Sequence, residues 1–183
     1  MSRRNLLPCI VIVALVATAL SGCDDVPSGG LPDLPTSDSW IPPAPTTAPP
    51  VPGGEAALVT YVVDGDTIEV QMNGGTYRVR YIGINTPEWD EPCGEEASAA
   101  NAVLVSGQTV TMVRDVSEVD PYGRLLRYVY VGDLFVNEYL VAQGWAEAVE
   151  YPPDTAFADY FEALEAEAAA RGLGCHPTGV FGD

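Results

Sequence analysis

The sequence predicts an α+β domain of about 128 residues that begins near Ala56. Short segments that alternate apolar and polar side chains predict strands, and three segments with helical spacing, each followed by a glycine, predict helices. A proline-rich composition upstream separates residues 24–55 from this domain. Strands interleaved with helices suit a small β-barrel that carries packed helices, although the strand pattern by itself leaves other α+β folds open.

The strand segments are short, and a hairpin joins the second and third of them. Asn73-Gly74-Gly75 is a hairpin turn signal between two β-rich runs. In the second run the side chains alternate, so Arg78 and Arg80 are expected on the same face of one strand. The predicted strands are 57–63, 67–72, 76–84, 109–114 and 125–131.

The segment 155–171 is the strongest of the three predicted helices, which also include 95–106 and 137–143. Asp154 is a candidate N-cap, and Gly172 follows the last helical residue. Apolar side chains recur at helical spacing, which indicates a stripe that faces the core. The stripe comprises Phe157, Tyr160, Phe161, Leu164 and Ala168.

Residues 1–23 are typical of a lipoprotein signal peptide. Arg3 and Arg4 precede an apolar run over 6–20, which is short for a membrane-spanning helix. The run ends in Leu20-Ser21-Gly22-Cys23, which looks like a bacterial-type lipobox; the alternative is an ordinary cleaved signal with an accidental cysteine. We therefore expect export, lipidation of Cys23 and a lipid anchor on the outer face of the cell membrane, by the twin-arginine or the general route.

Residues 24–55 predict a disordered or polyproline-like linker, since prolines cluster there and hydrophobic periodicity is weak. Its reach lies between roughly 30 Å as a coil and about 100 Å when extended. The domain that follows spans 56–183 and would be held away from the membrane surface.

Two cysteines remain for the exported domain, Cys93 and Cys175. An oxidising compartment favours their pairing in a disulfide. Two free thiols or a metal site are the alternatives, but His176 is the only histidine, which makes zinc a poor candidate. We expect His176 itself to be a tail residue rather than a catalyst.

Two oxygen-rich turns and two arginines carry the chemistry. Asp64-Gly65-Asp66 and Asn85-Thr86-Pro87-Glu88 supply hard oxygen ligands and a candidate general base. Arg80 and Tyr122-Gly123-Arg124 supply guanidinium groups that suit a phosphate. An EF-hand is excluded, because Glu69 stands where that loop needs glycine. The combination is what metal-assisted phosphodiester hydrolysis requires.

The same motifs in the same order resemble the staphylococcal nuclease (thermonuclease) family, over about 57–174. The resemblance implies a five-stranded OB-fold-type β-barrel with three helices. It also implies a Ca²⁺-dependent nuclease that hydrolyses DNA, and RNA as a second candidate, with little sequence preference. Nucleic acid would be the substrate; no protein partner is predicted, and a monomer is expected.

The resemblance implies a Ca²⁺ site. Asp66 and Asn85 would ligate by their side chains, Thr86 by its carbonyl, and Asp64 through water. The family member used for comparison has a carboxylate where Asn85 stands. The amide keeps an oxygen ligand but removes one negative charge, which predicts weaker Ca²⁺ binding.

The resemblance also assigns catalytic and substrate roles. Glu88 would act as general base on the attacking water, while Arg80 and Arg124 would clamp the phosphate and stabilise its developing charge. Tyr122 and Tyr151 are candidates for base stacking, with plain packing as the alternative.

The charge of the chain opposes a nucleic-acid substrate at long range. Aspartate and glutamate number 26 against 8 arginines, and there is no lysine. Salt screens exposed charges beyond about 8 Å, so the sign of the local cleft matters more than the total. The acidic surface is compatible with a solubility role, but it also favours the alternative of a catalytically inactive OB-type module that binds nucleic acid or protein.

Overall fold

The computed structural model describes residues 53–182. The predicted signal peptide with Cys23, and the linker up to residue 52, lie outside the described residues. Within 53–182, no helix is long and apolar enough to cross a membrane.

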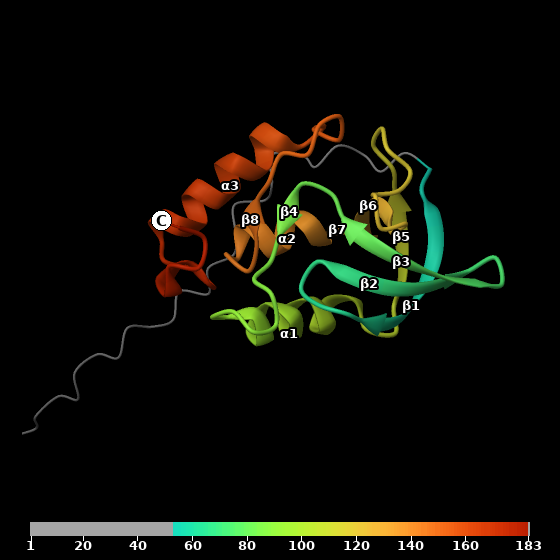
Figure 1. Cartoon of the computed structure of the whole chain (residues 1–183), viewed down its shortest axis with the longest axis horizontal. Helices are drawn as coiled ribbons and strands as arrows, with labels where there is room; N and C mark the ends of the chain where they lie inside the picture. Colours follow the sequence, from blue (N-terminus) through green and yellow to red (C-terminus); the bar gives the residue numbers. More distant parts are fainter. Residues whose placement is uncertain (1–52, 183) are drawn as a thin grey trace, which may run out of the picture. The chain divides into compact units, whose positions relative to one another are not determined.

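Five strands close into a barrel (Figure 1). Strand β1 (Glu55–Val62) pairs antiparallel with both β2 (Thr67–Met72) and β5 (Thr109–Val113). Strand β2 also pairs with β3 (Gly75–Tyr81), and β5 pairs with β6 (Leu125–Val131). The parallel pairing of β3 with β6 closes the ring. This confirms the expected five-stranded OB-type barrel of an α+β fold.

Three short strands lie outside the five-stranded ring. Strand β7 (Leu134–Phe135) continues the sheet beyond β6, and β4 (Ile84–Asn85) pairs antiparallel with β8 (Glu147–Ala148) in a separate two-stranded sheet. The predicted strand 76–84 is therefore two strands, with a glycine turn between them at Gly83.

Three helices pack against the barrel and one another. Helix α1 (Gly94–Val105) contacts β1 and α2 (Val136–Ala142), while α3 (Ala158–Ala170) contacts α2 and β8. Figure 1 shows α2 between α1 and α3. A short 3₁₀ helix, His176–Thr178, follows α3. The barrel interior and α2 share one apolar core, which also receives the predicted stripe of α3 except Ala168.

Helix α3 differs from its prediction at its start. It begins at Ala158 with Phe157 at the N-cap, rather than after Asp154. The carboxylate of Asp154 instead accepts hydrogen bonds from the backbone N–H groups of Val116 and Ser117, at 2.9 and 2.7 Å. The side chain is used for a loop far away in the sequence, so it is not free to cap the helix.

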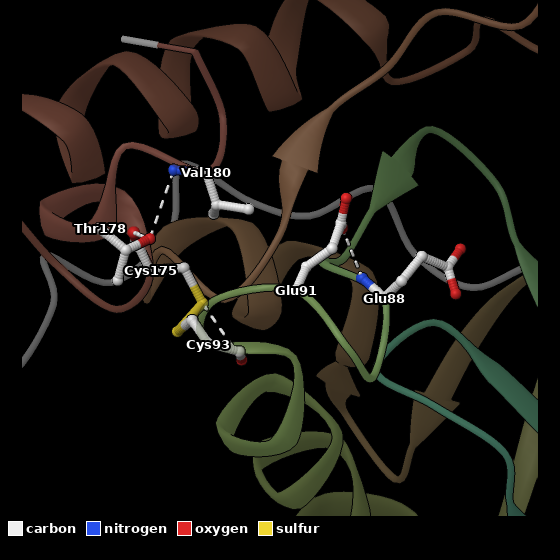
Figure 2. The surroundings of a disulfide bond; sticks show 6 residues. All are labelled: Glu88, Glu91, Cys93, Cys175, Thr178 and Val180. Atoms are coloured by element: carbon white, nitrogen blue, oxygen red, sulfur yellow. Dashed lines mark hydrogen bonds between the residues drawn. A yellow bond between two sulfur atoms is a disulfide. The ribbon is translucent and has the colours of Figure 1, made fainter.

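The two cysteines are joined as expected (Figure 2). Cys93 and Cys175 form a disulfide with their Cα atoms 5.6 Å apart, across a sequence separation of 82 residues. The bond ties the residue before α1 to the residue before the 3₁₀ helix. His176 follows the disulfide and is buried beside Phe181, away from the cleft described below, as expected of a tail residue.

Candidate active site

The predicted site residues gather in one cleft of about 510 Å³. It opens where the β1–β2 turn, the segment after β3 and the loops at 117–124 and 151–154 meet. Of the predicted site residues outside the disulfide, only Thr86 among those described does not line it, and Thr86 hydrogen-bonds to a residue that does. The predicted residues in its wall are Asp64, Asp66, Arg80, Asn85, Glu88, Tyr122, Arg124 and Tyr151.

The turn between β1 and β2 brings the two aspartates together. The Asp66 backbone N–H donates to Asp64 Oδ1 at 3.0 Å. A Cβ on Gly65 would lie 2.6 Å from Thr86 Oγ1, so only glycine allows the two oxygen-rich turns to approach this closely.

Asp66 is almost fully buried at the bottom of the cleft. Its Oδ2 accepts hydrogen bonds from the backbone N–H and hydroxyl of Thr86, at 2.9 and 3.2 Å, and forms a 3.1 Å ion pair with Arg80. Burial raises the pKa of Asp66 to about 6, although the charge of Arg80 opposes the rise. The charge of Asp64 adds to the rise in the pKa. The carboxylate thus carries its charge at neutral pH in an environment that favours an added cation.

Arg80 is the most constrained cation of the cleft. Antiparallel pairing places it opposite Thr67, next to Asp66 in sequence. Besides the ion pair, its guanidinium donates to the carbonyls of Tyr81 and Ile84, at 3.0 and 2.8 Å, and to Asn85 Oδ1 at 3.0 Å. Only 11% of the side chain is exposed. Arg80 is predicted from the sequence to bind the phosphate. Its contacts with two predicted metal ligands, Asp66 and Asn85, are not part of that prediction.

Arg124 lies at the rim of the cleft. Its Nε donates to Asp120 Oδ2 at 2.6 Å, and the guanidinium lies 5.5 Å from the ring centre of Tyr122. Asp120 Oδ1 also accepts from the backbone N–H groups of Tyr122 and Arg124. Although partial burial pushes the pKa of Asp120 up, the hydrogen bonds from Arg124 and Tyr122 outweigh it and hold the pKa below its ordinary value. Asp120 is therefore a positioning residue for the rim.

Glu88 is exposed and lines the cleft from the loop before α1. Its backbone N–H donates to Glu91 Oε2 at 2.8 Å, while its own carboxylate points away from the disulfide (Figure 2). A Cβ on Gly94 would lie 1.9 Å from the Glu88 carbonyl oxygen, so glycine at the start of α1 lets the loop pack closely. The carboxylate is accessible to water, as a general base needs to be.

The two tyrosines project from the wall of the cleft. Tyr122 is 85% exposed and Tyr151 is 53% exposed. Neither side chain fills the core, which argues against plain packing. Open aromatic faces of this kind suit stacking with bases.

The oxygen atoms around Asp66 fit Ca²⁺ in kind. Carboxylate, amide and carbonyl oxygens are the hard ligands that Ca²⁺ takes. Among residues 53–182, the Thr86 carbonyl and Asp64 Oδ2 accept no hydrogen bond. No three acidic, histidine or cysteine side chains in this range gather closely enough to hold a metal ion. A bound cation would therefore depend on the neutral ligands Asn85 and Thr86 as well as on the two aspartates.

Three acidic residues shape the site although the sequence predicts no site role for any of them, and only a helix-capping role for Asp154. Asp120 holds Arg124, Asp154 holds the loop at 116–117, and Glu147 Oε1 accepts a 3.0 Å hydrogen bond from Asn85 Nδ2. The spacing of four residues between Asp120 and Arg124 was the available signal for the first. Glu147 lies 62 residues from Asn85, and no local pattern connects the two.

Comparison with known proteins agrees with this geometry. Residues 78–175 match the family described as staphylococcal nuclease homologue. The chain is 37% identical over 126 residues to a thermonuclease of Staphylococcus intermedius, covering 66% of this chain and 75% of that protein. The chain is also similar to two proteins of Bacillus subtilis (strain 168). It is 42% identical to the SPbeta prophage-derived endonuclease YokF and 41% identical to the endonuclease YncB, in each case over 119 residues and 61% of this chain. These matches cover 40% and 56% of the two Bacillus proteins. The chain therefore belongs to the staphylococcal nuclease family, and its described domain is an enzyme of the nuclease type.

Proposed function

We propose that this protein is a Ca²⁺-dependent nuclease that hydrolyses phosphodiester bonds of DNA, and of RNA as a second substrate, with little sequence preference. The observation that carries the proposal is the convergence of Asp66, Arg80, Glu88 and Arg124 on one cleft. A module that only binds does not need a buried carboxylate and an exposed carboxylate in the same cleft. Nor does it need one guanidinium group at the bottom of that cleft and another at its rim.

The position of each side chain in the cleft indicates its role in the reaction. Glu88 would accept the proton of the attacking water, because its carboxylate is exposed and lines the cleft. Arg80 and Arg124 would hold the phosphate from the bottom and the rim and stabilise its growing charge. Bound Ca²⁺, held by Asp66, Asn85 and Thr86, with Asp64 acting through water, would supply positive charge against the same phosphate.

Substrate binding would be weak and would rely on local contacts. The net charge of −18 opposes the approach of a polyanion, so the arginines and the open faces of Tyr122 and Tyr151 must supply the attraction. Phosphate contacts and stacking carry little sequence information, which agrees with low sequence preference.

The test is cleavage of single-stranded DNA by the purified protein with Ca²⁺ or with a chelator, across a range of salt. Cleavage that needs Ca²⁺ supports the proposal. A folded protein that binds DNA without cutting it at any Ca²⁺ or salt concentration would instead support the inactive OB-type binding module.

We also propose that the protein acts outside the cell membrane, as a monomer tethered through lipidated Cys23 and the proline-rich segment that follows it. The motif around Cys23 supports this, although it lies outside the described residues. Replacement of Cys23 by Ser should release the protein from washed membranes. Retention of the Cys23→Ser variant at the wild-type level would contradict lipid anchoring.

A further inference from the structure

Asn85 lies between a group that can only donate hydrogen bonds and a group that can only accept them. Arg80 Nη2 donates to Asn85 Oδ1 at 3.0 Å, and Asn85 Nδ2 donates to Glu147 Oε1 at 3.0 Å. A guanidinium has no acceptor, and an ionised carboxylate has no donor. The orientation of the amide is therefore fixed by chemistry, with its oxygen toward Arg80, which also pairs with Asp66.

This orientation matters because an amide, unlike a carboxylate, has one end that cannot face a cation. An Asn85 rotated by half a turn about its last side-chain bond would present its N–H₂ group, instead of its oxygen, toward Arg80. Arg80 opposes that rotation from one side and Glu147 from the other. Arg80 is also expected to contact the phosphate, which leaves Glu147 as the partner on the side away from the reaction.

The fold places Glu147 at this position through strand pairing. Asn85 and Glu147 are direct partners in the antiparallel β4–β8 pair. Strand β8 is itself held by α3, because the Ala148 backbone N–H donates to Glu165 Oε2 at 3.0 Å. Glu147 is not among the residues that line the cleft, so it acts through Asn85 rather than on the substrate.

The carboxylate of Glu147 is not in direct contact with a cation of the described residues, since Arg80 lies on the far side of the Asn85 amide. Among residues 53–182, the carboxylate takes part in no ion pair, and the residue is partly buried. A hydrogen bond from the amide N–H₂ to a carboxylate makes the amide oxygen more negative. Asn85 has no negative charge of its own as a ligand, but the carboxylate of Glu147, which accepts a hydrogen bond from its amide, supplies one.

We propose that Glu147 is a positioning residue for the cation site, which orients the Asn85 oxygen toward the cleft and supplies the missing negative charge through the amide. The inference rests on the proposed Ca²⁺ dependence. It adds a residue that contacts neither the cation nor the substrate.

The experiment measures Ca²⁺ affinity by calorimetry for the purified protein, for Glu147→Gln and for Glu150→Gln. The control removes the same charge from an exposed residue on the same segment that has no contact with Asn85. Glu147→Gln should weaken Ca²⁺ binding about tenfold or more, which is the usual effect of removing the hydrogen-bond partner of a metal ligand. Glu150→Gln should change it by less than about twofold, because exposed charges are screened.

A double variant separates positioning from simple charge loss. In Asn85→Asp with Glu147→Gln, the polarity of the pair is reversed, since the new glutamine can donate to the new aspartate. The double variant should bind Ca²⁺ at least as tightly as the wild type and should melt, in chelator, above the temperature expected from adding the two single changes. Asn85→Asp alone should melt lower in chelator, because it sets two carboxylates against each other.

The outcomes distinguish this inference from the function it rests on. Wild-type protein that binds no Ca²⁺ would overturn both. Wild-type protein that binds Ca²⁺, with Glu147→Gln equal to the Glu150→Gln control, would overturn the role of Glu147 alone. A double variant no better than Glu147→Gln, and additive in its melting temperature, would do the same.

Discussion

The two arginines of the cleft are held in opposite ways. Arg80 is 11% exposed and contacts a buried carboxylate, two backbone carbonyls and an amide oxygen, whereas the Arg124 side chain is 29% exposed and is held by Asp120 and the ring of Tyr122. Charges count for more where water is excluded. We therefore expect the bottom of the cleft to serve both stability and function, and the rim to contact substrate at little structural cost.

Of the changes at the bottom and the rim, Arg80→Ala is expected to have the largest combined effect on stability and rate. The substitution leaves Asp66 buried without its cation and removes donors from three further acceptors. Breaking a buried pair costs about 3–5 kcal/mol, and loss of a charge-stabilising donor costs about 10²–10³ in kcat. Thermal melting and DNA cleavage should therefore both fall. A variant that melts like the wild type would contradict the structural role of the bottom of the cleft.

Arg124→Ala should separate rate from stability. Its ion pair is partly exposed, so the free energy of unfolding should fall by no more than about 1 kcal/mol. The rate of cleavage should fall about as far as for Arg80→Ala, because the same kind of phosphate contact is lost. If Arg124→Ala unfolds as readily as Arg80→Ala, the contrast between the bottom and the rim is wrong.

The raised pKa of Asp66 predicts a pH dependence of stability. Between its ordinary pKa near 3.8 and the folded value of about 6, the folded protein binds more protons than the unfolded chain. Stability from this group is therefore lost as the pH rises through that interval and stays low above it. In chelator, Asp66→Asn should remove this decline, and the difference in melting temperature between variant and wild type should grow from pH 4 to pH 6 and then level off. Parallel melting curves at all pH values would contradict the burial effect.

Tyr122→Ala should have the smallest effect. The ring is 85% exposed, so its loss should leave the melting temperature unchanged. Stacking on a base is worth about 1–3 kcal/mol, which predicts a rise in KM of roughly tenfold with kcat nearly constant. Tyr61→Ala is the matched control, since Tyr61 is 61% exposed on β1 and does not line the cleft. Equal KM values for the two variants would remove Tyr122 from the substrate site.

The fold was predictable where the signals are local. Alternation along β3, the turn at Asn73-Gly74-Gly75 and the glycines after the helices predicted element bounds that mostly agree with the structure within a residue or two. Pairings that depend on distant residues could not be found this way. The β4–β8 pair and the use of Asp154 by the loop at 116–117 both join segments far apart in sequence.

The site shows the same division. The motifs identified the residues that meet in the cleft, because their order resembles that of a known family. The partners of each residue were not predictable. Arg80 contacts Asp66 because of the β2–β3 register, and Glu147 contacts Asn85 because of a two-residue strand pair. Neither register can be predicted from the sequence around the residues concerned.

Catalysis in this cleft is expected to depend on Glu88 as the base that activates water. The most direct measurement is single-turnover cleavage of single-stranded DNA by Glu88→Gln, with Ca²⁺ affinity measured on the same preparation and Glu95→Gln as the control. We expect a rate lower by about 10²–10⁴, Ca²⁺ affinity close to that of the wild type, and an unchanged control. A Glu88→Gln variant that cuts at the wild-type rate would exclude Glu88 as the general base.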